Sequence, residues 1–194
     1  PQTTAVHLPF TDLALGASGP DAIVERHYNN RATMASEFGA GWSWSFGAKI
    51  TKVGSDLILH DGFGGEIAFH STSEKTWAAT MLGQQIELKN GGYLRTATGE
   101  GAAERYDRNG LLVERMDAAA RKVTVLRNDK GLPTAIVAAN GRKLVVKTDA
   151  SGKIVSMADP AGRTATYIYQ DGRLAKSSVH GLETAYAYDA DGLL

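Results

Sequence analysis

A glycine recurs at nearly constant spacing through the second half of the chain, and this rhythm constrains the fold more than any other feature. Gly110, Gly131, Gly152, Gly172 and Gly192 are 21, 21, 20 and 20 residues apart. An Asp or Asn lies shortly before each glycine, and an aliphatic residue or a proline follows two positions after it. A fixed period of about 20 residues is typical of a protein built from stacked supersecondary units.

A second series of turns lies midway between these glycines, so each repeat contains two turns. Gly141, Gly162 and Gly181 hold the midway position, and Ala120 takes it in the first repeat. An Asx residue ahead of glycine favours a tight hairpin, because the Asx side chain caps the turn and glycine tolerates a positive φ. The glycines that we expect at hairpin turns are Gly110, Gly131, Gly141, Gly152, Gly162, Gly172, Gly181 and Gly192.

The segments between the turns are rich in β-branched and aromatic residues, which favour strands. This composition is clearest at residues 122–127, 143–148, 164–170 and 184–188. A single hairpin is marginally stable, so successive hairpins are expected to pair side by side in one antiparallel sheet. Such a sheet is a ribbon with an open edge at each end.

Residues 1–100 are also strand-like but less regular. Alternating segments occur at 4–15 and 22–30, and hairpins are expected at 56–70, turning at Asp61–Gly64, and at 84–97. No stretch shows a helical period over 11 or more residues. We therefore predict an all-β chain with two regions. Residues 1–100 form the first, and residues 101–194 form about four and a half repeats of 20–21 residues, continuous with the first sheet.

The later repeats resemble the YD repeats of the RHS family. "YIYQDGRL" at residues 167–174 and "YAYDADGLL" at 186–194 follow the family pattern of two alternate tyrosines, an Asp and a turn glycine. The earlier repeats depart from it, since Val145 and Lys147 stand in the two tyrosine positions. Those units are degenerate YD repeats.

The first half is similar to the region that opens many RHS arrays. The stretches that carry this resemblance are "ERHYNNRATMASEFGAGWSWSF" at residues 25–46 and "LILHDGFGGEIAF" at 57–69. The resemblance thus covers nearly the full chain. It implies a curved antiparallel sheet of consecutive hairpins, a segment of a β-shell whose winding continues beyond residue 194.

The resemblance also implies a function. In bacterial RHS proteins the shell encloses or delivers a C-terminal toxin domain, so the expected partners are the remainder of the shell and that polymorphic toxin domain. It implies a secreted protein, or one delivered by a bacterial secretion system, with a role in bacterial competition. The first ten residues show no signal-peptide pattern. The alternative is an extracellular adhesion or glycan-binding module, and an unrecognised hydrolase is a third hypothesis.

The residues themselves predict no enzyme, cofactor or metal site. There is no cysteine, and the 21 basic and 21 acidic side chains balance, which gives no reason to expect nucleic acid as a partner. No apolar run is long enough to insert into a membrane. His60, Asp61 and His70 are candidate metal ligands across a hairpin, but their spacing matches no metal motif. Exposed edge strands would also allow self-association.

Aromatic residues are expected to have structural roles. Trp42 and Trp44 fall on one face of a strand, with Phe46, and are expected to pack the curved sheet, because aromatic side chains dominate core burial. A sugar-stacking platform that includes Trp77 is the alternative. The pairs Tyr167 with Tyr169 and Tyr186 with Tyr188 are expected to form a cross-strand ladder.

Overall fold

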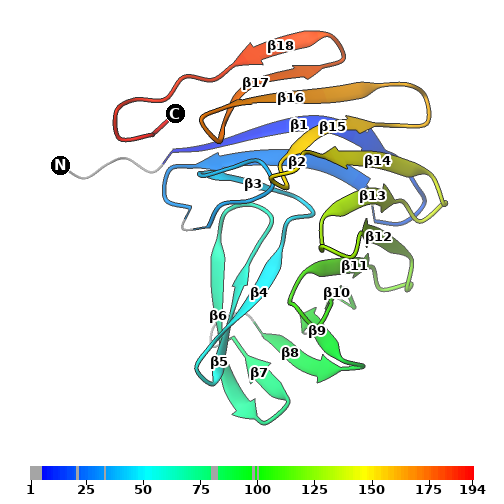
Figure 1. Cartoon of the computed structure of the whole chain (residues 1–194). Coiled ribbons are helices and arrows are strands. Elements are labelled where there is room, and N and C mark those ends of the chain that lie inside the picture. Colours follow the sequence, from blue (N-terminus) through cyan, green and yellow to red (C-terminus); the bar gives the residue numbers. More distant parts are fainter. Residues whose placement is uncertain (1–5, 21, 33, 80–82, 98, 100) are drawn as a thin grey trace.

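The computed structural model describes residues 6–20, 22–32, 34–79, 83–97, 99 and 101–194 (Figure 1). These residues fold into strands, turns and loops, and the described ranges contain no helix. The strands form one sheet of 3 strands and one of 15 strands. Neighbouring strands in both sheets run antiparallel. The predicted all-β fold of consecutive hairpins is confirmed.

The first sheet, which we call the small sheet, has the order β1-β2-β3. Its strands are β1 (His7–Leu15), β2 (Ala22–Asn29) and β3 (Trp42–Trp44). Phe10 and Trp44 both pair with Arg26 in the central strand, so Arg26 lies at the middle of the sheet.

The second sheet, which we call the large sheet, follows the chain without a crossover from β4 to β18. The strands before residue 100 and the repeats after it belong to this one sheet, because Ala103 pairs with Thr96. Its strands are β4 (Lys49–Val53), β5 (Asp56–His60), β6 (Glu66–Ser73), β7 (Thr76–Ala78), β8 (Gln84–Lys89), β9 (Gly92–Ala97), β10 (Ala103–Tyr106), β11 (Leu112–Met116), β12 (Lys122–Arg127), β13 (Pro133–Val137), β14 (Lys143–Thr148), β15 (Ile154–Ala158), β16 (Thr164–Gln170), β17 (Arg173–Val179) and β18 (Leu182–Ala185).

The predicted strands at 122–127, 143–148 and 164–170 coincide with β12, β14 and β16. The last predicted strand, 184–188, does not, because β18 ends at Ala185. The Tyr186 N–H still donates to the Ala175 carbonyl at 2.9 Å, but the chain then leaves the strand. The tyrosine side chains of this segment bond instead to the small sheet, as described below.

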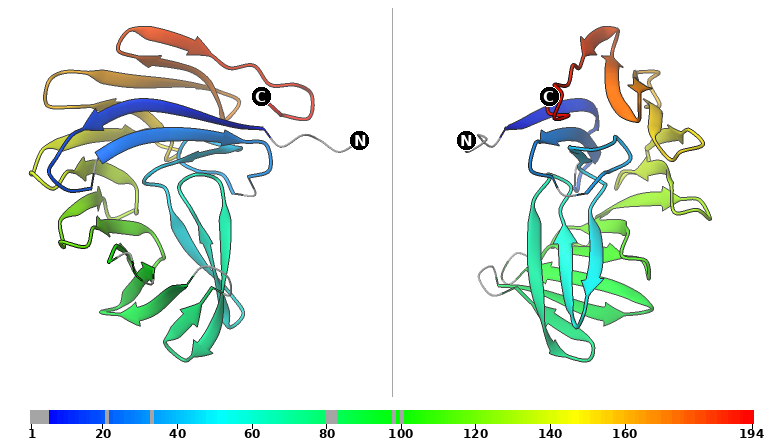
Figure 2. Two further views of the ribbon diagram at one scale, coloured as in Figure 1. Left: turned by 180° about the vertical axis from the view of Figure 1, so that it is seen from behind. Right: turned by 60° about the vertical axis from the view of Figure 1, so that its left-hand side comes forward.

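The large sheet bends through a deep arc, and the small sheet lies inside the arc next to the strands from β14 to β17 (Figures 1 and 2). The two sheets share one apolar core. The side chains that fill it include Leu13, Val24, Tyr28, Phe38, Trp42 and Trp44 from the first part of the chain, and Val125, Ile136, Leu144, Met157, Ala165 and Tyr167 from the large sheet.

One edge of the large sheet is partly covered, which corrects the expectation of an open edge at each end. Beside β4, the Ile50 N–H donates to the Gly110 carbonyl at 2.8 Å, and the Leu112 N–H donates to the Ala48 carbonyl at 3.2 Å. The sheet curls so far that its first strand meets the β10–β11 turn. Of the two outer strands of the large sheet, β18 is the more exposed, and Leu182 there is 78% exposed.

Most of the repeat turns share one construction, whereas the turns at Gly172 and Gly181 are tighter, with Asp171 and His180 also at positive φ (50° and 53°). At the first repeat turn, Asp107 Oδ1 accepts the backbone N–H groups of Asn109 and Leu111 at 2.9 and 2.8 Å. Asn128, Asp149, Asp159 and Asp189 accept the equivalent pairs in their own turns. The eight predicted turn glycines have φ between 76° and 86°, a left-handed conformation that L residues avoid. Ala120 adopts the same region at φ 59°.

Neighbouring repeats also pack through these glycines. A β-carbon at Gly131 would lie 3.0 Å from Leu111 Cδ1, and one at Gly152 would lie 3.1 Å from Leu132 Cδ2. Whereas a β-carbon at Gly172 would meet nothing within 4 Å, at these two positions the residue after one repeat glycine packs against the glycine of the next repeat. This contact gives a packing reason for the 20-residue period, in addition to the backbone conformation of the turn.

Candidate functional site

The most distinctive polar group of the molecule is an ion pair buried between the two sheets. Arg26 of β2 donates to both carboxylate oxygens of Asp12 in β1, from Nε to Oδ2 at 2.6 Å and from Nη2 to Oδ1 at 2.8 Å. Each side chain is 1% exposed. A bidentate pair of this kind is both strong and geometrically specific.

Residues of the large sheet complete the hydrogen bonds of this pair. The Tyr167 hydroxyl of β16 donates to Asp12 Oδ2 at 2.6 Å. Arg26 donates to the Tyr186 hydroxyl at 3.2 Å and to Ser177 Oγ of β17 at 3.4 Å. The ion pair therefore connects the small sheet to the concave face of the large sheet.

Aromatic rings surround the Arg26 guanidinium on several sides. Its Cζ atom lies 5.1–5.8 Å from the centroids of five rings, a distance suited to cation–π attraction. The rings are those of Phe10, Phe38, Trp42, Tyr167 and Tyr186. A buried charge is tolerated when it is paired and hydrogen-bonded, and both conditions are met here.

The protonation states of Arg26 and Tyr167 are fixed by their surroundings. Burial alone would lower the pKa of Arg26, but the hydrogen bonds and the negative charge of Asp12 raise it above its ordinary value. Burial and the Asp12 charge raise the pKa of the Tyr167 hydroxyl well above its ordinary value. Arg26 is thus a permanent cation and Tyr167 a permanent donor, an arrangement that holds the two sheets together.

The two tryptophans for which we predicted a packing role lie between the sheets. Trp42 and Trp44 are both 0% exposed. The Trp42 Nε1–H donates to the Tyr188 hydroxyl at 2.9 Å, and the Trp44 Nε1–H donates to Glu37 Oε2 at 2.8 Å. Trp77, at 4% exposed, is also buried. A sugar could not stack on any of the three rings in this fold, so the alternative of a stacking platform is wrong, and Trp42 and Trp44 pack in the core as expected.

The four predicted tyrosines lie at the interface, but not as a cross-strand ladder. Tyr167 faces Ser177 across the strand pair and Tyr169 faces Leu174. The Tyr167 ring packs edge-on against Phe38 at 4.9 Å, and the Tyr186 ring against Trp42 at 5.1 Å. The ladder interpretation is therefore wrong.

The remaining hydroxyls of this set also fasten segments together. Tyr169 donates to the Ile154 carbonyl at 2.7 Å, and Tyr188 donates to the Leu174 carbonyl at 2.8 Å. Because each ring presents a polar tip to the other sheet or to a neighbouring strand, paired tyrosines in the later repeats serve the docking of the small sheet.

Residues 36–50 run along one row of repeat turns and attach to several of them. The Ile154 N–H donates to the Glu37 carbonyl at 2.9 Å, and Arg127 Nη2 donates to the Phe46 carbonyl at 3.5 Å. A β-carbon at Gly39 would lie 3.0 Å from the Gly172 carbonyl oxygen. The segment therefore fixes the spacing of successive repeats at this rim.

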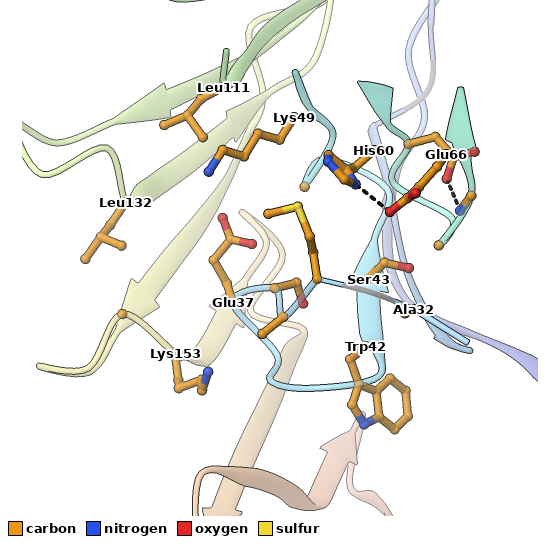
Figure 3. Close-up of a pocket in the computed structure, with 18 of the residues that line it drawn as sticks. Ala32, Glu37, Trp42, Ser43, Lys49, His60, Glu66, Leu111, Leu132 and Lys153 are labelled. Carbon is orange, nitrogen blue, oxygen red and sulfur yellow. Dashed lines mark hydrogen bonds and ion pairs between the residues drawn. The ribbon is translucent and has the colours of Figure 1, made fainter. Parts of the chain in front are cut away.

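A cavity of about 280 Å³ lies beside this segment (Figure 3). Leu111, Leu132 and Lys153, each the residue after a repeat glycine, line one side of it, and His60 and Glu66 line the other. Positive and negative side chains are mixed around it, so the cavity has no evident preference for an anion or a cation.

The candidate metal ligands are not brought together. His60 Nδ1 lies 3.0 Å from Glu66 Oε1, and His70 Nδ1 lies 3.0 Å from Asp56 Oδ2. Asp61 Oδ1 accepts the N–H groups of Phe63 and Gly65 in its own turn. Each of the three residues has a separate partner, and the described ranges hold no cluster of three or more potential ligands.

Asp12 and Arg26 are the central residues that sequence reasoning missed. A signal for Arg26 was present, because it alternates with Val24 and Tyr28 in β2 and so shares their inward face. Asp12 gave no such signal, since a bulge between Thr11 and Leu13 disrupts the alternation of β1.

These features define a class: an all-β protein in which a repeat-built sheet curves around a small N-terminal sheet and is tied to it by a buried ion pair. Over residues 3–69 the chain is similar to a family described as a domain of unknown function, DUF6531. The matched segment contains the small sheet and the strands up to Phe69 in β6. No curated protein matches the chain. Across the described ranges, no helix has the length and apolarity to span a membrane.

Proposed function

We propose that the chain is the opening segment of an RHS/YD-repeat shell that encloses or delivers a C-terminal toxin domain. The observation that carries this proposal is the unbroken order of the large sheet, in which each hairpin pairs with the next from β4 to β18. A wall that grows by one strand per half-repeat suits a container, because each added repeat extends the wall by the same amount.

The small sheet supports the same proposal. It fills the concave side of the later repeats of this chain, beside β14 to β17, and is held there by Arg26, Tyr167 and Tyr186. In this role the segment closes one end of the shell and fixes the curvature with which later repeats wind. The role is structural and non-enzymatic, and the partners are the remaining shell and the enclosed domain.

Two further features fit this role. The β18 strand leaves an exposed edge on which another strand can pair. The region similar to DUF6531 precedes the repeats, as an end-closing unit would. Delivery by a bacterial secretion system belongs to the same proposal. The adhesion alternative has less support, because the aromatic residues that would stack on sugars are buried.

The test is protection of a C-terminal domain from protease in the intact natural polypeptide that carries this segment. We expect that domain to be cleaved at least tenfold more slowly in the intact polypeptide than as an isolated fragment. Arg26→Met should remove much of the protection, whereas Arg105→Met, at an exposed ion pair with Glu114, should not. Equal cleavage rates in the intact and isolated forms would contradict the proposal.

A further inference from the structure

Two histidines of the small sheet share a hydrogen bond at the beginning of β1. His27 Nδ1 lies 3.2 Å from His7 Nε2. The rings are nearly parallel, with an interplanar angle of 5° and centroids 5.2 Å apart. Such a bond needs a donor nitrogen on one ring and an acceptor on the other, so at least one imidazole must be neutral.

The surroundings of His27 favour its neutral form. The residue is 5% exposed, and its Nε2 atom has no hydrogen-bond partner among the described residues. The Phe63 ring packs edge-on against it at 4.9 Å. A proton added to Nε2 would be a buried donor with nothing to accept it, and such a group is costly.

Charged groups around the pair only partly offset this cost. Glu25 Oε2, on the same strand, lies 3.8 Å from His27 Nε2, beyond hydrogen-bond distance. Asp61, in the β5–β6 turn, also attracts a proton to His27. Arg115 of β11 lies over the Phe63 ring, 6.0 Å from its centroid, and adds a positive charge to the neighbourhood. No carboxylate therefore lies within hydrogen-bond reach of Nε2.

The two ends of β1 are held in different ways. Near its C-terminal half, Asp12 is bound to Arg26 and Tyr167, whose charge states are fixed. At its beginning the Asn30 N–H donates to the Val6 carbonyl, the Val6 N–H donates to Asn30 Oδ1, and the side chains of His7 and His27 meet. Of these two side-chain contacts, only the one at the beginning is made by imidazoles, the class of side chain that most often serves as a pH switch.

We propose that His7 and His27 form a pH-sensitive latch that holds the beginning of β1 on β2 at neutral pH and releases it as the solution becomes acidic. When both imidazoles are protonated, neither can accept the shared hydrogen bond, and two positive charges face each other. The Asp12–Arg26 pair then retains the rest of the strand. This inference does not depend on the proposed shell function.

The sign of the effect follows from the direction of the pKa shift. Burial, followed by the charge of His7, lowers the pKa of His27 below its ordinary value of 6.5, although Glu25 and Asp61 act in the opposite direction. The open strand therefore binds more protons than the closed strand just below pH 6.5. The closed state is fully stable above that pH and loses stability as the pH falls towards the lowered pKa.

Amide hydrogen exchange tests the latch in the full chain. Protection factors, corrected for the intrinsic effect of pH, are compared at pH 7.5 and 5.0 for residues 7–11 and for β14. We expect protection at residues 7–11 to fall about three- to tenfold, with β14 changing much less. The amide of His7→Gln replaces Nε2 and that of His27→Asn replaces Nδ1, so each variant keeps a hydrogen-bonding group without titration.

Both variants should flatten the pH dependence at residues 7–11, even if they lower stability at every pH. His180→Asn is the matched control, because His180 is exposed in a turn at φ 53°, which Asn tolerates, and its variant should behave like wild type. The proposal is overturned if wild-type protection at residues 7–11 does not change with pH. It is also overturned if the double variant His7→Gln/His27→Asn keeps the wild-type pH dependence.

Discussion

The hydroxyl of Tyr167 donates to Asp12 Oδ2 at 2.6 Å across 155 residues of sequence, and so joins the first strand of the small sheet to the sixteenth strand of the fold. Asp12 in turn holds Arg26, which reaches Tyr186 and Ser177. A single buried charge pair thus connects the strand that begins the chain to the repeats that end it.

Removing the buried cation should be severely destabilising. Arg26→Met leaves the Asp12 carboxylate buried without its counter-charge, which we expect to lower the free energy of unfolding by about 3–5 kcal/mol. Urea denaturation followed by tryptophan fluorescence measures this change, because Trp42 lies in the same cluster.

The matched control for this variant is Arg105→Met. Its ion pair with Glu114 is 47% exposed on the arginine side, and we expect a loss below about 1 kcal/mol. If Arg26→Met costs no more than this control, the ion pair does not hold the two sheets together.

The hydroxyl of Tyr167 should contribute to the stability of the fold independently of its ring. Tyr167→Phe keeps the ring against Phe38 but removes the donor to Asp12, and we expect a loss of about 1–3 kcal/mol in unfolding free energy. Tyr93→Phe, on β9 and outside the Asp12–Arg26 cluster, is the comparison. Equal effects of the two substitutions would show that the hydrogen bond to Asp12 is energetically neutral.

Alanine substitutions at the turn glycines should lower the unfolding free energy by different amounts, depending on whether a side chain packs against the glycine. Gly162→Ala meets open space and incurs only the left-handed strain of φ 83°, about 1 kcal/mol. Gly131→Ala has similar strain but also meets Leu111 Cδ1 at 3.0 Å, so we expect a loss about 1 kcal/mol larger.

The complementary substitution is Ala120→Gly, which relieves a left-handed alanine at φ 59°. It should raise the unfolding free energy by about 0.5–1 kcal/mol. Thermal or urea denaturation of the three variants checks the order. A Gly131→Ala variant no less stable than Gly162→Ala would contradict the packing of Leu111 on Gly131.

The free edge of β18 should mediate self-association of the 194-residue chain. Because the Tyr186 N–H points to β17, the N–H groups of Glu183 and Ala185 point outward. We expect concentration-dependent dimers in sedimentation velocity, and Ala185→Pro should weaken them by removing an outward donor while leaving the bonds to β17. A wild-type chain that stays monomeric at high concentration would exclude this edge as an interface.

Much of the fold could be predicted from local sequence, because hairpin turns and strands depend on residues close together in the chain. The Asp107–Gly110 turn needs only a side chain two to four residues from the N–H groups that it binds. The strands at 122–127 and 164–170 were visible from their β-branched and aromatic residues for the same reason.

The parts that escaped prediction all depend on contacts between distant residues. The meeting of Ile50 with Gly110 requires the sheet to curl, and no local pattern encodes how far it bends. The partners of Tyr167 and Tyr186 lie in the small sheet, so spacing within the repeat suggested the wrong neighbours. Separation of β1–β3 from the large sheet was likewise invisible, since those strands alternate like the rest.

The most direct measurement is a cryo-electron microscopy structure of the intact polypeptide in which this segment occurs. Our account predicts a further strand hydrogen-bonded to the outer edge of β18 at Glu183 and Ala185, with the small sheet still bound through Arg26 at one end of a hollow wall. A β18 edge left facing solvent, or a small sheet detached from Tyr167, would contradict it.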